Sequence, residues 1–571
     1  MKNNPSSIAR SCIVLTVTLL LAGARCAGAA DSANGDPAEP PSSTINGPLT
    51  SEEIARLRAA IALQQKQIEA LQHMIDQQQL LLERAAETPR LPERRRELGN
   101  VASLAPMVPP TPTPPSAVPP PPQKTATATA NPCEAPPDAN AVPTYLRIGA
   151  ACIVPVGFMD LTAVWRDKDA GSSIGTNFSS IPYNNVAAGK NSEFRFSTQN
   201  SRIGFRVDGD WKGAHFIGYN EFDFLGTSGA TNLGVSNNAF VPRLRQFWVN
   251  VRKNNFEFLA GQSWTMLTPN RRGISPLPGD LFYSQVIDVN YMIGLTWARQ
   301  GGVRVLYHPN EKVTMGLSFE NPDQYIGGSA GSPTVALPSA LASLAGSQLD
   351  NQTNVLSSPN LHPDIIAKIA FDPSSRFHGE VAGIERTFRV WNPATNQYST
   401  KPGAGVSVGL NFELVKNVRL LTHNYWSDGG GRYLFGQAPD LVLHADGSIS
   451  AVHAGGTVDG VEATVKNWLF YAYYGGIYTG KNVVIDTNGA RVGYGYPGSP
   501  NSQNRAINEV TFGFNQTIWK NPKYGALNAM GQYQYTLRSP WSVAAGAPKS
   551  AHDNTIYFNF RYTLPGSMPS F

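Results

Sequence analysis

The segment Asn554–Leu564 most constrains the fold, because its side chains alternate between apolar and polar along one predicted strand. One face carries Ile556, Phe558, Phe560, Tyr562 and Leu564, and the other carries Tyr557, Asn559, Arg561 and Thr563. The same alternation recurs through residues 144–571, with Tyr, Trp and Phe near the ends of the predicted strands. Alternating strands flanked by aromatic residues are typical of a transmembrane β-barrel. The predicted fold class is therefore an all-β transmembrane barrel.

The first thirty residues have the pattern of a secretory signal peptide. Lys2 and Arg10 precede an apolar run over 13–24, and small residues follow at 27–30. This run is too short to span a bilayer, so we predict a cleaved signal over 1–30. Cys26 permits a lipoprotein interpretation, although Arg25 stands where a small residue is preferred. No later segment has enough consecutive apolar residues for a membrane helix.

A coiled coil is predicted over residues 51–88, after a polar disordered lead over 31–50. The stretch Thr50–Glu53 has the form of a capping box. Behind it, a heptad seam has Ile at successive a positions and Leu or Gln at d positions. The seam residues are Ile54, Leu57, Ile61, Gln64, Ile68, Leu71, Ile75, Gln78 and Leu82. The apolar seam residues are predicted oligomerisation contacts; the alternative is a single amphipathic helix.

Residues 89–143 form a Pro-rich linker, which includes the stretches 109–115 and 119–122. Such a composition favours extended polyproline II structure and cannot build a core. Cys133 and Cys152 are the two cysteines outside the predicted signal. They can form one disulfide in an oxidising periplasm or remain free thiols, and the sequence does not decide between these alternatives.

Residues 144–571 are predicted to form about sixteen antiparallel strands. An even number in this range is expected to leave an aqueous channel. One of these strands is placed at 285–297, and residues 427–464 are read as one long loop. Short turns are predicted at 253–255, 308–311, 372–375, 416–417 and 521–522. Long loops are expected at the opposite end of the barrel.

Strand parity predicts which charged side chains face the interior. Ile203, Phe205 and Val207 alternate with Arg202 and Arg206, which places both arginines on the inner wall. Phe194 and Phe196 have the opposite parity, so we predict a bulge near Asn200. Arg304 alternates with outward residues in the same way, whereas Arg243 and Arg245 fall out of phase and have no assigned side.

The segment 261–280 interrupts the strand pattern. Folded into the barrel, it forms a constriction in which Arg271, Arg272 and Asp280 set a local field. The alternative is an ordinary external loop, in which these charges are merely solvated.

Composition and motifs narrow the functional class. Charged residues make up 15% of the chain, and the net charge of +5 is too small to indicate a nucleic-acid partner. The sequence has no His-Glu-x-x-His motif, and its nine His residues are scattered. We therefore expect no enzymatic activity, cofactor or metal.

The order of signal, coiled coil, Pro-rich spacer and barrel resembles the DcaP-like trimeric outer-membrane porins of Gram-negative bacteria. The motifs that carry the resemblance are 201–206, 244–249 and 261–264. The resemblance implies a homotrimer in the outer membrane, a periplasmic coiled coil and an arginine-lined constriction that passes small anions such as dicarboxylates. It supports Arg202, Arg206 and Arg245 as constriction residues, with Arg271 and Arg272 less secure. The chain departs from the usual porin ending in residues 565–571.

Two functional hypotheses follow. The first is a passive porin in which arginines favour anions over cations; phosphate or sugar selectivity remains an alternative. The second is a structural anchor, in which the coiled coil contacts the cell wall or a periplasmic partner and the barrel holds the protein in outer-membrane lipid.

Overall fold

The computed structural model describes residues 145–226, 240–281, 285–327, 334–344, 360–392 and 395–565. All of them belong to the larger of two compact units, Val118–Phe571. The predicted signal peptide, lead, coiled coil with its heptad residues, and Pro-rich linker lie outside the described residues. Those predictions stay predictions.

Most of the described residues form β-strands, and the helices are short 3-10 turns. The first half contains β1 (Leu146–Ile148), β2 (Ala151–Arg166), β3 (Glu193–Ser197), β4 (Arg202–Trp211), β5 (Ala214–Gly226), β6 (Val241–Lys253), β7 (Phe256–Trp264), β8 (Arg299–Asn310), β9 (Val313–Glu320), β10 (Asp364–Ser374) and β11 (Phe377–Asn392). The second half contains β12 (Gln397–Val415), β13 (Val418–Asp428), β14 (Leu441–Leu443), β15 (Ile449–Ala451), β16 (His453–Val465), β17 (Trp468–Thr479), β18 (Asn482–Ile485), β19 (Arg491–Tyr494), β20 (Asn504–Asn521), β21 (Gly525–Pro540) and β22 (Ala551–Thr563). The 3-10 turns are η1 (Phe178–Ser180), η2 (Ala187–Gly189), η3 (Pro278–Asp280), η4 (Ser339–Leu344) and η5 (Gly431–Tyr433). None of the described helices is long and apolar enough to cross a membrane.

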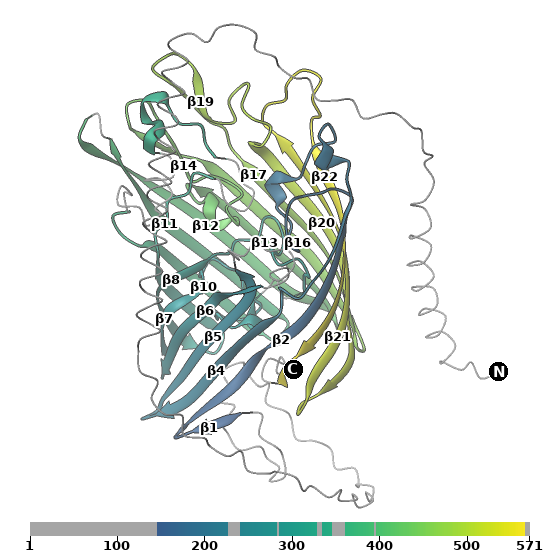
Figure 1. Cartoon of the computed structure of the whole chain (residues 1–571). Helices are drawn as coiled ribbons and strands as arrows, with labels where there is room; N and C mark the ends of the chain where they lie inside the picture. The colour runs from purple at the N-terminus through teal and green to yellow at the C-terminus, as the bar shows by residue number, and fades with distance from the viewer. Residues whose placement is uncertain are drawn as a thin grey trace, which may run out of the picture. The chain divides into compact units, whose positions relative to one another are not determined.

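The strands close into one antiparallel barrel (Figure 1). Closure is made by β2 and β22, which pair from Phe158–Thr563 to Arg166–Thr555. β3 and β4 pair with the same edge of β2 and act as one interrupted strand. β1 is a three-residue strand that folds back and pairs antiparallel with the start of β2, so it is not counted as a barrel strand. Among the described residues, the barrel therefore has sixteen strands, which confirms the predicted number. β14–β15 and β18–β19 form two separate hairpins.

The predicted number is correct although two of the assignments are wrong. Residues 285–297 are not a strand: they continue a long connection between β7 and β8. β16 replaces the second half of the predicted loop 427–464. Both errors arise because apolar residues were used to recognise lipid-facing strands. Residues 285–297 are apolar but are buried inside the barrel. β16 is a barrel strand with few apolar residues on its outer face.

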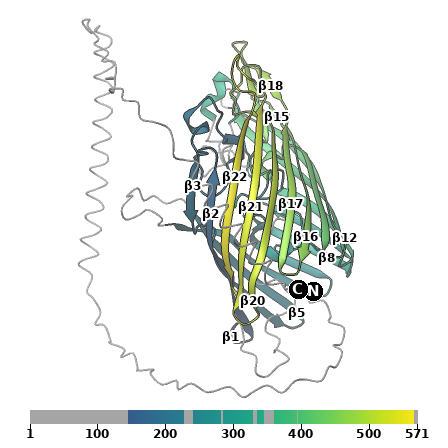
Figure 2. The ribbon, with the colours of Figure 1, turned by 90° about the vertical axis from the view of Figure 1, so that its right-hand side faces the viewer.

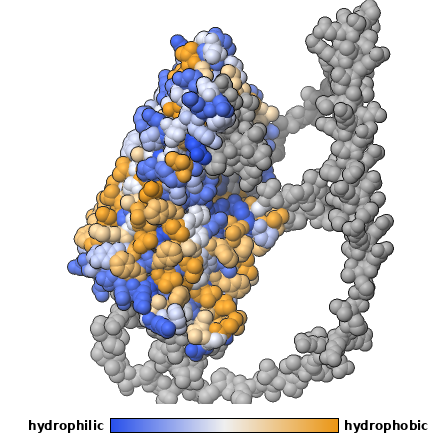
Figure 3. Space-filling model, turned by 90° about the vertical axis from the view of Figure 1, so that its left-hand side faces the viewer, coloured by the Kyte–Doolittle hydropathy of each residue, from blue (hydrophilic) through white to orange (hydrophobic). Residues whose placement is uncertain are grey.

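The outer face of the barrel is apolar and the inner face is polar. Exposed apolar side chains such as Ile203, Phe205, Phe247, Val305 and Ile369 all point outward. Figure 3 shows hydrophobic side chains gathered over the lower part of one side, with hydrophilic side chains above them. This arrangement fits a barrel whose outer wall faces lipid.

The predicted irregularity near Asn200 is present as a break between β3 and β4. Phe194 and Phe196 before the break and Ile203 and Phe205 after it are all exposed on the outer face. The break therefore restores the outward direction of the apolar residues after a change of parity.

Tight turns join the strands at one end of the barrel, which we call the turn end. Lys212, Asn254, Asn417 and Lys466 have φ values of 49°, 53°, 68° and 55°. Positive φ is the requirement of two-residue hairpin turns of type I′, which match the twist of paired strands. The turns predicted at 253–255 and 416–417 are confirmed. The long connections, including β14, β15, β18 and β19, lie at the other end, the loop end (Figures 1 and 2).

Cys152 on β2 is buried and takes part in a disulfide bond. Its partner lies outside the described residues. The free-thiol alternative is therefore wrong for Cys152.

Candidate functional site

The described parts of the connection between β7 and β8, residues 265–281 and 285–298, run through the barrel interior, and we call them the inner segment. Carboxylates and one amide on the barrel wall accept hydrogen bonds from its backbone N–H groups. These pairs are Met266 to Glu320 (2.8 Å), Asn270 to Glu380 (3.2 Å), Gly273 to Asp372 (3.0 Å), Ile287 to Gln532 (2.7 Å) and Ile293 to Glu509 (3.0 Å). Hydrogen bonds to an ionised carboxylate are stronger than neutral ones. The wall therefore holds the inner segment on two sides, at β9–β11 and at β20–β21.

The inner segment also contacts the backbone of β16 and β17 through Gly294, which has a φ of 88°. A Cβ at this position would overlap the carbonyl oxygen of Thr457 on β16 and lie 2.6 Å from that of Gly476 on β17. Both the backbone conformation and the close approach therefore require glycine.

We expect Gly294→Ala to destabilise the protein by about 1–3 kcal/mol, because it adds backbone strain and a steric clash. The measurement is the urea concentration at the unfolding midpoint. Gly279→Ala is the matched control, because Gly279 lies in the same segment with no atom within 4 Å of the added Cβ. Equal midpoints for the two variants would contradict this account of Gly294.

Arginines and carboxylates of β4, β5 and β6 form a cluster on the inner wall. Arg245 binds Glu221 at 2.8 Å and Asp223 at 2.6 Å. Arg243 binds Asp223 at 2.7 Å, and Arg202 lies 3.5 Å from Glu221. The three arginines thus share two carboxylates of β5.

A β-bulge decides the side on which Arg245 lies. Glu221 pairs with Gln246, but the next residue, Phe222, pairs with Leu244, so Arg245 is the extra residue of β6. The bulge turns Arg245 inward, where only 2% of the residue is exposed. This resolves the parity conflict of the sequence.

Tyr291 of the inner segment completes the cluster. Its hydroxyl oxygen accepts hydrogen bonds from Arg245 at 2.7 Å and from Arg202 at 3.2 Å. Burial by itself raises the pKa of Tyr291, but the guanidinium charges of Arg245 and Arg202 outweigh it and lower the pKa below its ordinary value. The inner segment is therefore bound directly to the arginines of the wall.

Arg299 adds a further positive charge at the start of β8. Its guanidinium lies 5.9 Å from the ring of Trp264, and Arg245 lies 5.4 Å from the same ring. Its hydrogen bond goes to the carbonyl oxygen of Leu244 at 3.5 Å, and within the described part of the chain no carboxylate forms an ion pair with it. The four arginines 202, 243, 245 and 299 face two carboxylates, which leaves a local excess of two positive charges. Such an excess attracts anions.

The other predicted site residues lie apart from this cluster. Arg206 forms a local ion pair with Asp208 on β4 at 2.6 Å. Arg304 is buried and donates to the carbonyl oxygen of Trp264 at 2.7 Å. Of the seven residues predicted for the site, Arg202 and Arg245 join this cluster, and Arg304 approaches it through Trp264. Asp280 lies instead within electrostatic reach of Arg206 and Arg272.

Arg271, Arg272 and Asp280 all belong to the inner segment. Arg271 forms an ion pair with Glu462 on β16 at 2.6 Å, so it attaches the inner segment to that strand. Its backbone N–H donates to the carbonyl oxygen of Asp280 at 2.6 Å, while the neighbouring Arg272 is exposed. Arg271 is therefore occupied by a structural contact.

Sequence reasoning missed Arg299, Tyr291, Glu221 and Asp223, and left Arg243 unassigned. Tyr291 was placed within the wrongly predicted strand 285–297. Glu221 and Asp223 alternate with Phe222 and Phe224 on β5, so strand parity was a usable signal for these two carboxylates.

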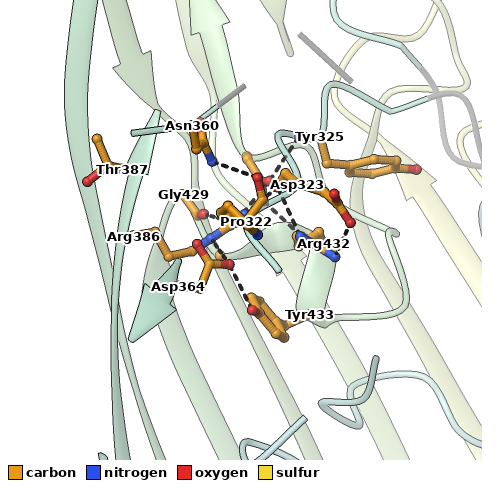
Figure 4. Close-up of polar contacts among 12 residues, drawn as sticks. Pro322, Asp323, Tyr325, Asn360, Asp364, Arg386, Thr387, Gly429, Arg432 and Tyr433 are labelled. Carbon is orange, nitrogen blue, oxygen red and sulfur yellow. Dashed lines mark hydrogen bonds and ion pairs between the residues drawn. The ribbon is translucent and has the colours of Figure 1, made fainter. Parts of the chain in front are cut away.

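A second polar cluster ties the loop-end connections to the wall (Figure 4). Arg386 on β11 binds Asp364 on β10 and Asp440 of a loop, each at 2.9 Å. Arg386 also donates to the carbonyl oxygens of Gly429 and Asp323, both at 2.6 Å. The guanidinium of Arg386 and the carboxylates of Asp364 and Asp440 are fully buried, whereas the side chain of Asp323 is 37% exposed. The cluster fixes two loops over the barrel interior.

The described residues contain no group of His, Cys, Asp or Glu side chains arranged to hold a metal ion.

Comparison with solved structures places the barrel fold among outer-membrane channels. The outer membrane channel DcaP of Acinetobacter baumannii matches with a TM-score of 0.54 at 17% identity, over 73% of this chain and 98% of that one. An anion-selective porin from Comamonas acidovorans (12% identity, 72% of this chain and 99% of that one, TM-score 0.41) and OmpF of Salmonella typhi (10%, 73% and 99%, 0.40) also match, but too weakly to carry an argument. No family model and no curated protein sequence matches the chain. The first likeness shows a shared porin-like barrel fold.

Proposed function

We propose that this protein is an outer-membrane porin of the DcaP-like type, which lets small hydrophilic anions such as dicarboxylates diffuse passively. The observation that carries the proposal is the cluster of Arg202, Arg243, Arg245 and Arg299 beside the inner segment, with its excess of positive charge. The apolar outer face supports a place in the membrane, and the DcaP likeness supports the porin fold.

The proposed mechanism is electrostatic. The inner segment narrows the path through the barrel, and the arginines on one side of it lower the barrier for anions and raise it for cations. The ring of Trp264, the hydroxyl of Tyr291 and the ion pairs with Glu221 and Asp223 hold the guanidiniums in place. No bond is made or broken.

The test is a planar-bilayer recording of the purified mature protein under a salt gradient. We expect discrete conductance steps and a reversal potential that indicates anion preference. A folded, heat-modifiable barrel that conducts no ions would contradict the porin proposal.

We infer that three copies assemble through the predicted coiled coil over residues 51–88. The heptad seam supports assembly of several copies, and the resemblance to DcaP-like trimeric porins supports the number three. The coiled coil also supports the second candidate, a structural anchor to the cell wall. Deleting residues 51–88 separates the two functions. Weakened envelope integrity with unchanged single-channel conductance favours the anchor, whereas unchanged integrity favours a role in porin assembly alone.

A further inference from the structure

The outer face of β13 and β16 carries a polar patch, formed by Thr422, Asn424, Thr457 and Asp459. Asp459 is exposed and accepts hydrogen bonds from the hydroxyls of Thr422 at 2.6 Å and Thr457 at 3.0 Å. The Asn424 amide donates to the Thr422 hydroxyl at 3.0 Å. Figure 2 faces the side of the barrel that carries β16 and β17.

This polar patch lies among apolar outward residues, away from the strand ends. Thr422 and Asn424 pair with Leu410 and Val408 of β12, which are 38% and 41% exposed. β13 has 11 residues and β16 has 13, and a strand needs about 9–11 residues to cross a bilayer. The middle of each strand therefore lies within the hydrocarbon layer once the barrel is in a membrane.

Lipid cannot satisfy this patch. Acyl chains neither donate nor accept hydrogen bonds, and lipid headgroups lie well outside the middle of the layer. An ionisable side chain facing acyl chains is costly, so such residues in membrane proteins pair with other polar groups. A protein surface is the membrane component that can offer a partner at this depth.

The patch is complementary to itself. Asn424 pairs with Thr457 and Asp459 pairs with Thr422, so Asn424 and Asp459 occupy neighbouring residue pairs on the outer face, and the tilt of barrel strands brings them to similar depths. A second copy related by a twofold axis along the membrane normal keeps every residue at its depth. Asn424 of one copy then meets Asp459 of the other, and the reverse pair forms equally. The amide of Asn424 has a second hydrogen to donate, and the carboxylate of Asp459 has further acceptor sites.

We propose that this patch is a contact surface for a second copy of this chain, which brings barrels together side by side in the membrane. A threefold ring uses two different surfaces at each contact, whereas this contact uses one surface twice. The contact therefore lies between neighbouring trimers of the proposed porin. The inference rests on the proposed membrane location, and its place between trimers rests on the proposed trimer; neither depends on the solute or the selectivity.

The test uses Leu420→Cys, which places a thiol beside the patch on the same face of β13 and leaves the patch intact. The purified full chain in liposomes is treated with a short bismaleimide, and crosslinked pairs are counted by gel. Ile369→Cys is the matched control, because Ile369 is outward and 52% exposed on β10, away from the patch. We expect crosslinked pairs with Leu420→Cys and only the collision background with Ile369→Cys.

Variants of the patch provide the second arm. Added to Leu420→Cys, Asp459→Leu or Asn424→Leu should lower the yield of crosslinked pairs at least fivefold, while Asp459→Asn should retain most of it. Equal yields for Leu420→Cys and Ile369→Cys, or no loss with both leucine variants, would overturn the proposal. So would crosslinking in native membranes exclusively to a different protein. Single-channel conductance should not change in any of these variants, so a failed porin proposal remains distinguishable.

Discussion

The double variant Arg243→Gln/Arg299→Gln should lose most of the anion preference of the channel. It removes the excess positive charge and leaves Arg202 and Arg245 opposite Glu221 and Asp223. One unit charge about 4 Å from an ion in water is worth about 1 kcal/mol, roughly a fivefold change in relative permeability. We expect the anion-to-cation permeability ratio to fall roughly five- to twentyfold, measured from the reversal potential in a potassium chloride gradient.

Arg243 and Arg299 are the arginines of the cluster that can be neutralised with the least damage to its ion pairs. Arg299 has no carboxylate bound to it within the described residues, and Asp223 keeps Arg245 when Arg243 is neutralised. Removing the buried Arg245 instead would take the nearest cation from Glu221 and one of the two cations from Asp223, and would threaten folding.

Arg195→Gln is the matched control, because Arg195 is 47% exposed beside Glu193 on β3 and lies outside the cluster. Its permeability ratio should equal that of the unmodified protein. The effect of the double variant should also shrink as the salt concentration rises, because exposed charges are screened. If the double variant keeps the original ratio with normal conductance, the cluster does not set selectivity.

Arg386→Met should be the most destabilising single substitution among the polar clusters of the barrel. The guanidinium compensates the buried carboxylates of Asp364 and Asp440, and methionine fills similar space without charge. Breaking a buried ion pair by removing one partner costs about 3–5 kcal/mol. The measurement is the free energy of unfolding in urea, together with the rate of proteolysis within residues 429–440.

Arg376→Met is the control for this prediction. Arg376 is 70% exposed and lies 3.6 Å from Glu413, a geometry typical of surface ion pairs worth less than about 1 kcal/mol. The triple variant Arg386→Met/Asp364→Asn/Asp440→Asn should recover part of the lost stability, because no charge remains buried. Similar losses for Arg386→Met and Arg376→Met would show that the cluster does not stabilise the loops.

Local patterning was sufficient for much of the barrel. The alternation around Ile203 and Phe205 predicted correctly that Arg202 and Arg206 face inward, since successive side chains of a strand point to opposite sides. Turn residues such as Asn254 and Asn417 identified hairpins, because they tolerate the positive φ that such turns require.

The two wrong assignments have one physical cause. Val286, Ile287 and Val289 have the composition of a strand, yet they are buried inside the barrel, and an apolar run does not reveal what will cover it. β16 was missed because its outward positions over 453–461 are His453, Gly455, Thr457, Asp459 and Val461, which do not resemble a lipid-facing row. The strand that escaped prediction is thus one of the two that carry the polar outer patch.

The sequence by itself determined the class of fold, most of the barrel strands and the inward direction of the β4 arginines, because these depend on period-two alternation within single strands. Only the tertiary structure decided the site. The bulge that turns Arg245 inward, the meeting of Tyr291 with Arg202, and the joining of Arg386 to Asp364 and Asp440 depend on pairing between distant segments. Strand register and the path of the inner segment bring those partners together, and neither leaves a local signal in the chain.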